Sequence, residues 1–189
     1  MSLQQLDASA FNGTRTIDWF GPGDQPGDLA RLTVNGYADS AGVRAVTVEK
    51  AAAAQSVTIS RCSPLGLRAN VEQGTGLLLA TNLTAAPLRL KWSAGVRAVG
   101  AFLVAQAAFG TPFTAVMWVW LARANAWESV SVQGTTGDIW QRPGDSVAPF
   151  IAVQASASDL ITAVYFDAVH PSNQPFSPIG IGRLYFQDV

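Results

Sequence analysis

The segment Phe113–Arg123 constrains the fold more than any other part of the chain. Side chains alternate between the two faces of a strand. One face here carries Phe113 and Met117, the other carries Trp118 and Trp120, and both faces are mainly apolar. A buried helix has similar hydrophobicity, but the β-branched and aromatic residues and a preceding Gly-Thr-Pro turn signal favour a strand. The segment therefore predicts a central strand of a β-sandwich or barrel, covered on both sides.

The neighbouring residues extend this strand into a three-stranded unit, Val96–Gly134, joined by two turns. Arg123–Ala126 reads as a turn in which Asn125 can adopt a positive φ. Trp127–Gln133 then alternates again and predicts a half-buried partner strand whose valines, Val130 and Val132, face inward.

Short strands with turn signals between them continue along the whole chain, and about eleven are expected. They include Thr14–Phe20, Leu29–Asn35, Val43–Glu49, Pro87–Trp92, Val96–Gln106, Phe150–Ala155, Leu160–Ala168 and Ile179–Gln187. Ser93–Gly95 is predicted to be a turn, and residues 1–12 an irregular N-terminal arm. We expect residues 1–189 to form a single all-β domain, a two-sheet antiparallel β-sandwich of the jelly-roll type.

Composition narrows the class of function. Among 189 residues, 49% are hydrophobic, 13% are charged and the formal net charge is −1. Without a basic cluster the chain is not expected to bind nucleic acid. No apolar run is long enough to span a bilayer. One cysteine and one histidine exclude an internal disulfide and a zinc-finger type of metal site.

The composition suits an extracellular or cell-surface β domain better than a cytosolic helical enzyme. Residues 1–10 lack the basic and apolar regions of a signal peptide. The compartment therefore stays open, with a cytoplasmic location as the alternative.

The second half resembles the bacterial secreted β-sandwich domains of PEP-CTERM-type surface proteins, which are jelly rolls like many carbohydrate-binding modules. The segments that carry the resemblance are Trp92–Phe102, Thr114–Trp127, Phe150–Val153, Leu160–Phe166 and Ile179–Phe186. The resemblance implies a jelly roll that binds carbohydrate without catalysis.

The chain departs from this pattern at the residues that bear on a metal. In related jelly rolls, acidic residues near the first and last strands often hold a structural calcium ion. Here Gly182-Arg183 stands where an Ile-Asp pair is common, although Asp18 and Asp188 could contribute oxygen ligands. The expected cofactor is therefore none, with structural calcium as the alternative.

Aromatic residues are the candidates for ligand binding, because sugars stack their apolar faces on exposed rings. Trp140 lies in a polar stretch beside hydrogen-bonding side chains. The predicted ligand-binding residues are Trp140, Asp138, Arg142, Asp145, Trp127 and His170. An alternative for Trp140 is that its side chain folds back and covers the edge of the sandwich. Trp118 and Trp120 share a strand face, a spacing that suits adjacent sugar rings, but their apolar neighbours favour packing in the core.

No catalytic constellation stands out. No G-x-S-x-G elbow accompanies His170, and nothing brings Glu49 and Glu128 together as a glycosidase pair. A polysaccharide lyase would use a His or Tyr base and a cation that neutralises a uronate. The nearest candidates are His170, Tyr165, Tyr185 and Arg183, and Tyr165 and Arg183 lie on predicted strands that could be adjacent.

Three functions remain as hypotheses. The first is a non-catalytic domain that binds carbohydrate or another polar small ligand. The second is a structural protein whose apolar surface, suggested by a mean hydropathy of +0.21, is buried in a homo-oligomer. The third is a polysaccharide lyase or hydrolase that uses the His170 region.

Overall fold

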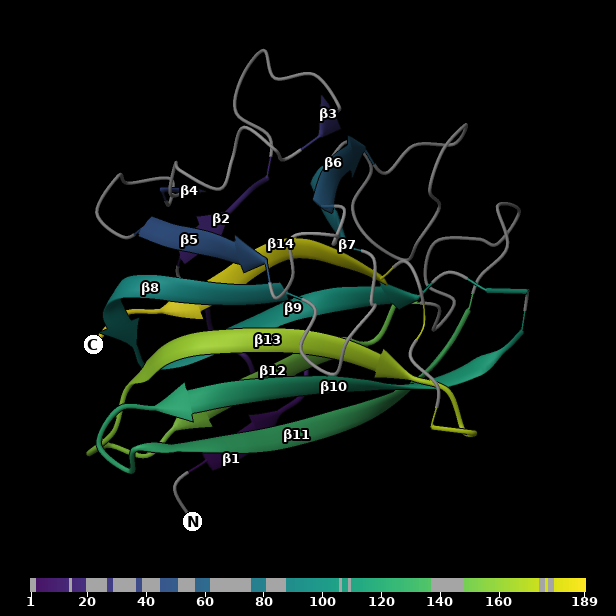
Figure 1. Ribbon diagram of the computed structural model, residues 1–189. Coiled ribbons are helices and arrows are strands. Elements are labelled where there is room, and N and C mark those ends of the chain that lie inside the picture. Colours follow the sequence, from purple (N-terminus) through teal and green to yellow (C-terminus); the bar gives the residue numbers. More distant parts are fainter. Residues whose placement is uncertain are drawn as a thin grey trace.

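A computed structural model of the chain contains two antiparallel β-sheets packed face to face (Figure 1). It describes residues 3–13, 15–19, 27–28, 37–38, 45–50, 57–61, 76–80, 88–105, 107–108, 110–136, 148–173, 176 and 179–189. Within these ranges every regular element is a strand. The predicted all-β sandwich is confirmed.

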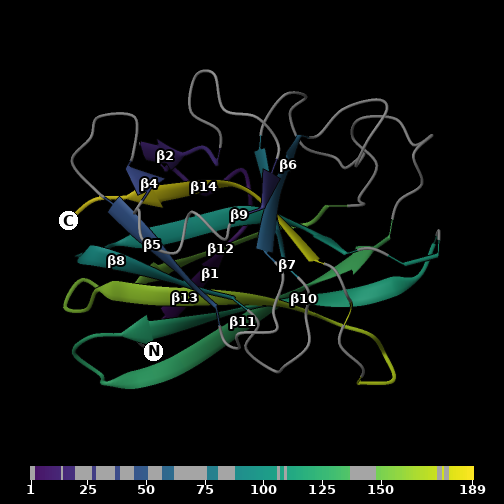
Figure 2. The same cartoon turned by 45° about the horizontal axis from the view of Figure 1, so that its top comes forward.

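The described strands form an eight-stranded and a six-stranded sheet. The eight-stranded sheet contains β1 (Leu3–Leu6), β2 (Arg15–Ile17), β3 (Gly27–Asp28), β6 (Val57–Arg61), β7 (Gly76–Ala80), β9 (Ala98–Ala105), β12 (Phe150–Ala155) and β14 (Ile179–Gln187). The six-stranded sheet contains β4 (Tyr37–Ala38), β5 (Ala45–Lys50), β8 (Leu88–Val96), β10 (Pro112–Leu121), β11 (Ala126–Thr135) and β13 (Ile161–Val169). In Figure 2 the layer of β14, β9 and β12 lies above the layer of β13, β10 and β11.

The winding from β7 to β14 is that of a jelly roll. The eight-stranded sheet runs β12-β9-β14-β7 in its centre, and the six-stranded sheet runs β11-β10-β13-β8. The chain thus crosses between the sheets at nearly every step, and β14 and β13 each insert between two earlier strands. Two Greek keys of this kind define the double-sheet jelly roll.

The core lies between the sheets and follows the alternation of the strands. In β10, Phe113, Met117 and Leu121 are completely buried. They pack with the inward-facing residues of β9 and β14, such as Leu103 and Phe186. Val130 and Val132 of β11 also pack against this core, as the sequence predicts. The inner faces therefore form one continuous apolar layer.

Two local predictions are wrong. The N-terminal arm is not irregular throughout, because Leu3–Leu6 pairs with β12 as an edge strand. The predicted turn at Ser93–Gly95 is instead part of β8, which continues to Val96. A Cβ atom at Gly95 would lie only 2.8 Å from the Cβ atom of Leu160. Glycine is required here by close packing, not by a turn.

Within the described residues, no helix is long and apolar enough to cross a membrane.

Candidate functional site

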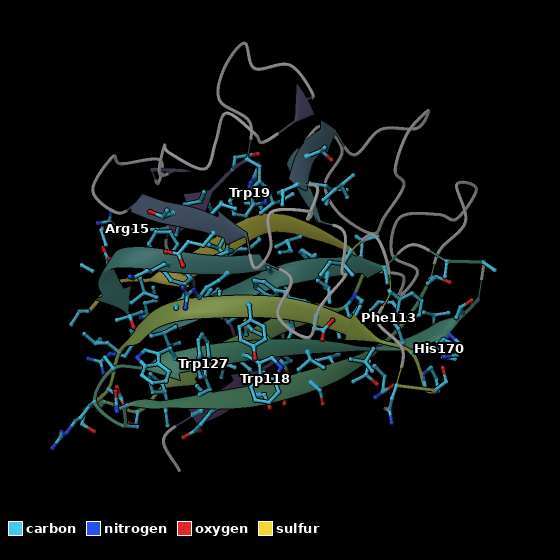
Figure 3. All side chains as sticks on the ribbon, viewed as in Figure 1. Arg15, Trp19, Phe113, Trp118, Trp127 and His170 are labelled. Atoms are coloured by element: carbon cyan, nitrogen blue, oxygen red, sulfur yellow. The ribbon has the colours of Figure 1, made fainter. Side chains whose placement is uncertain are left out.

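Four aromatic side chains meet on the outer face of the six-stranded sheet. They are Trp118 and Trp120 of β10, Trp127 of β11 and Tyr165 of β13, and we call them the aromatic cluster. All four are half-buried. The prediction that Trp118 and Trp120 pack in the core is wrong, because the inward positions of β10 belong to Met117, Val119 and Leu121. Figure 3 shows Trp118 and Trp127 on the outer side of β10 and β11.

The ladders of three adjacent strands bring these rings together. Trp120 lies opposite Trp127 on β11, and Trp118 lies opposite Tyr165 on β13. The Trp118 and Tyr165 rings are nearly parallel, at 19°, with centroids 5.8 Å apart. Trp127 contacts Trp120 edge-on at 5.4 Å and Tyr165 at 5.0 Å. The four rings are therefore one connected surface.

Polar and small side chains border the cluster along the rows that run across the strands. One row runs Trp127, Trp120, Ala163, Lys91, Thr47, and the next runs Ser129, Trp118, Tyr165, Arg89, Glu49. At about 4.8 Å per strand, the part of the first row from Trp127 to Lys91 spans roughly 14 Å. Arg89 donates from Nε to Glu49 at 2.7 Å, so this charge is paired within the sheet. The face thus combines an apolar ring surface with hydrogen-bonding groups at its border.

Tyr165 keeps its phenol proton over the physiological pH range. Burial raises the pKa of the Tyr165 phenol above its usual value, and the negative charge of Asp167 raises it further. Asp167 is largely buried and accepts a hydrogen bond at 2.8 Å from the backbone N–H of Ala168. A neutral phenol at the centre of the cluster can both donate and accept a hydrogen bond.

The turn beside the cluster is held by a buried carboxylate. Asp159 is only 5% exposed and follows the turn that leads into β13. It accepts hydrogen bonds from the backbone N–H groups of Arg123 (2.8 Å), Ala124 (3.0 Å) and Leu160 (2.8 Å). The first two belong to the β10–β11 turn, where Asn125 has the predicted positive φ of 52°. Asp159 therefore fixes the connection between Trp120 and Trp127.

Two of the predicted ligand-binding residues can be placed. Trp127 belongs to the aromatic cluster. His170 follows β13 and lies toward the other end of the sheet (Figure 3). Its Nδ1 accepts a hydrogen bond from the Ser172 N–H at 3.1 Å and lies 2.7 Å from the Ser172 hydroxyl. His170 also packs on Phe176, so its ring organises the turn that follows β13.

The other four predicted ligand-binding residues lie outside the described residues. They are Trp140, Asp138, Arg142 and Asp145. A binding role for this stretch stays a prediction. Its sequence signal was a tryptophan among polar residues, whereas the aromatic cluster arises from tryptophans at alternate positions of one strand and aromatics on its two neighbours.

The carboxylates and bases that the sequence suggests for catalysis lie apart wherever the structure describes them. Glu49 lies on the outer face of β5, whereas Glu128 is at an inward position of β11 at the far edge of the sheet. Tyr165 and Arg183, which the lyase hypothesis places on neighbouring strands, belong to different sheets. The described geometry therefore offers these residues no shared site.

The two aspartates considered for calcium are each paired with an arginine. Arg183 donates to Asp18 at 2.8 Å, and Arg15 forms an ion pair with Asp188. Asp18 also accepts from the backbone N–H of Gly76 at 3.3 Å. Across the described ranges, no three histidine, cysteine, aspartate or glutamate residues cluster as a metal site would require.

No family model matches the chain. No curated protein matches it either. A search of solved structures finds the N-terminal endo-1,4-β-D-xylanase 10B of Clostridium thermocellum, its CBM22-1 and GH10 modules complexed with xylohexaose. The two chains are 9% identical with a TM-score of 0.39, and the match covers 71% of this chain but 25% of that one. This chain thus spans about a quarter of the length of that xylanase chain.

Proposed function

We propose that the chain is a non-catalytic carbohydrate-binding domain whose ligand lies on the aromatic cluster. The observation that supports this most directly is the placement of three tryptophans and a tyrosine on an outer sheet face. The outer face of an antiparallel sheet ordinarily carries polar side chains. Large apolar rings there are best explained by a ligand that covers them.

The chemistry of the cluster fits a pyranose ligand. Sugars with mainly equatorial hydroxyls present flat C–H faces, and these faces pack on indole and phenol rings. The neutral Tyr165 phenol, Ser129 and Lys91 then offer hydrogen bonds at the ring edges. β-1,4-linked gluco- and xylo-oligosaccharides have such faces in succession, and they are the first ligands to test. A role on extracellular or surface glycans belongs to the same proposal.

The test is isothermal titration of the wild-type domain and two single variants with cello- and xylo-oligosaccharides. Trp118→Ala should weaken binding roughly tenfold or more, as for a central aromatic anchor. It should lower the melting temperature by only a few degrees, because Trp118 is half-buried outside the core and loses mainly its ring contact with Tyr165. Loss of binding in Trp140→Ala alone would instead place the site in the stretch around Trp140. Full affinity in Trp118→Ala would remove the cluster from the site.

A second copy of the chain is the alternative cover for the cluster. Among the described large apolar side chains, only Val189, at 70%, is strongly exposed. This favours a small ligand over a broad apolar interface. Light scattering at high concentration separates the two, because a dimer that Trp118→Ala converts to monomer would support assembly.

A further inference from the structure

A groove runs along the side of the sandwich where edge strands of the two sheets approach each other. It has a volume of about 700 Å³ and is lined by β1, β11, the end of β12 and the turn that follows β12. We call it the edge groove. Its volume lies within the range of small-ligand sites. Gln5 of β1 lines the groove, and its side-chain Nε2 donates a hydrogen bond to the backbone oxygen of Ser131 on β11 at 3.1 Å.

The lining of the edge groove combines polar and apolar side chains. Gln5 contributes an amide and Glu128 contributes a carboxylate, whereas Gln4 and Gln154, which pair with each other, lie on the outer face of the eight-stranded sheet. The apolar part of the lining includes the half-buried Leu3 and Val130, which pack against the core, and Ala155. Side-chain amides pair well with neighbouring hydroxyls of a sugar, because each amide both donates and accepts. Carboxylates accept from the same hydroxyls.

The backbone of β11 adds further hydrogen-bonding groups to the edge groove. Successive residues of an antiparallel strand direct their N–H and C=O groups alternately to the two sides. The Ser131 oxygen meets the amide of Gln5 and therefore points away from β10. Ser129 is two residues earlier, so its N–H and C=O also point to the groove side. A donor and an acceptor of fixed position are thus aimed at the space that Ser129 lines.

Ser129 also borders the aromatic cluster, since it lies opposite Trp118 in the β10–β11 ladder. Trp127 lies two residues before it on the same outer face. A chain-like ligand that extends from the aromatic cluster across β11 therefore reaches the edge groove directly. Among the described strands none separates the two, because β11 is at the edge of the six-stranded sheet.

We propose that the edge groove is a second subsite, which hydrogen-bonds further sugar units of the glycan held by the aromatic cluster. This inference rests on the proposed function and adds the class of ligand: an oligosaccharide long enough to pass around the edge of β11. The cluster supplies stacking at one end, and Gln5, Glu128 and the backbone of Ser129 supply hydrogen bonds at the other.

The experiment measures affinity against ligand length, from disaccharide to hexasaccharide, in the cello and xylo series. Ala157 is exposed and lines the groove. Ala157→Arg should fill the groove with a long side chain and leave the cluster untouched. Ala107 is also exposed but lies outside the groove, so Ala107→Arg is the matched control. Glu128→Gln tests the carboxylate without changing its shape. Melting temperatures verify that each variant folds.

In the wild type and in Ala107→Arg, affinity should rise with length to the hexasaccharide. In Ala157→Arg the disaccharide should bind as in the wild type, whereas the hexasaccharide should lose roughly tenfold, the worth of a few hydrogen bonds. Glu128→Gln should lower the affinity for the hexasaccharide by a smaller factor than Ala157→Arg does. Equal hexasaccharide affinity in wild type and Ala157→Arg, with binding still dependent on Trp118, overturns the groove and leaves the proposed function intact. A wild type that binds no member of either series overturns both.

Discussion

Replacing Asp159 tests whether a single carboxylate holds the turn beside the aromatic cluster. Its three backbone hydrogen bonds, of 2.8 to 3.0 Å, join the β10–β11 turn to the start of β13. Hydrogen bonds to a charged group contribute about 1.5–3 kcal/mol each when buried. The N–H groups of Arg123 and Ala124 belong to an exposed turn and regain water in the variant, so we take about 3 kcal/mol in total for Asp159→Ala. For a domain of this size that is roughly 6–12 °C in melting temperature.

The pH dependence makes the test specific to the carboxylate. Burial by itself would raise the pKa of Asp159, but the N–H groups of Arg123, Leu160 and Ala124 and the charge of Arg123 outweigh it, so the pKa is lowered below 3.8. The stabilisation is therefore complete above the unfolded-state value and is lost as the pH falls through the folded-state pKa.

Asp159→Asn retains the shape and one acceptor, and it should cost about half as much as the alanine variant. Thermal melts at about pH 7 and about pH 3 should show the gap between wild type and Asp159→Asn narrowing in acid. A melting temperature of Asp159→Ala within about 2 °C of wild type would refute the reasoning. A gap that does not change with pH would do the same.

Three further outcomes are expected. Trp19→Phe should cost about 1–2 kcal/mol more than Trp92→Phe in chemical denaturation. Both indoles are buried, but Nε1 of Trp19 donates to two carbonyls of β14, at 3.0 and 2.7 Å, whereas that of Trp92 has no partner among the described residues. Calcium and EDTA should leave the melting temperature unchanged, because arginines neutralise Asp18 and Asp188, and a rise with calcium would contradict this. Ultraviolet titration should show one phenol that ionises above pH 10, and this transition should be absent in Tyr165→Phe. The stabilisation of the fold by the neutral phenol is complete below the unfolded-state pKa and is lost as the pH rises through the folded-state pKa.

The fold was predictable because strand alternation is a local property. Phe150–Ala155 and Ile179–Gln187 occur with the predicted bounds. Gly95 was misread because glycine marks both turns and places where another chain segment comes close. Here the neighbour is Leu160, which is distant in sequence. The residues around Gly95 contain no sign of that contact.

The candidate site was predictable only in part, for the same physical reason. The alternation of β10 correctly separates Trp118 and Trp120 from Met117. It cannot decide which of two apolar faces meets the second sheet, because both satisfy the same pattern. That choice depends on total burial across the sheet, where Phe113, Met117 and Leu121 meet the large residues of β9 and β14.

The order of the strands explains why the aromatic cluster needs the whole jelly roll. Trp118, Trp120 and Trp127 come from a hairpin and meet through local pairing. Tyr165 joins them only because β13 inserts between β10 and β8, which happens after the chain has crossed to the other sheet and back. The ring contacts between Tyr165 and both Trp118 and Trp127 therefore close only when the non-local ladder forms. A ligand that spans these rings would bind the completed sandwich and not the isolated hairpin, so its binding free energy would stabilise the whole fold.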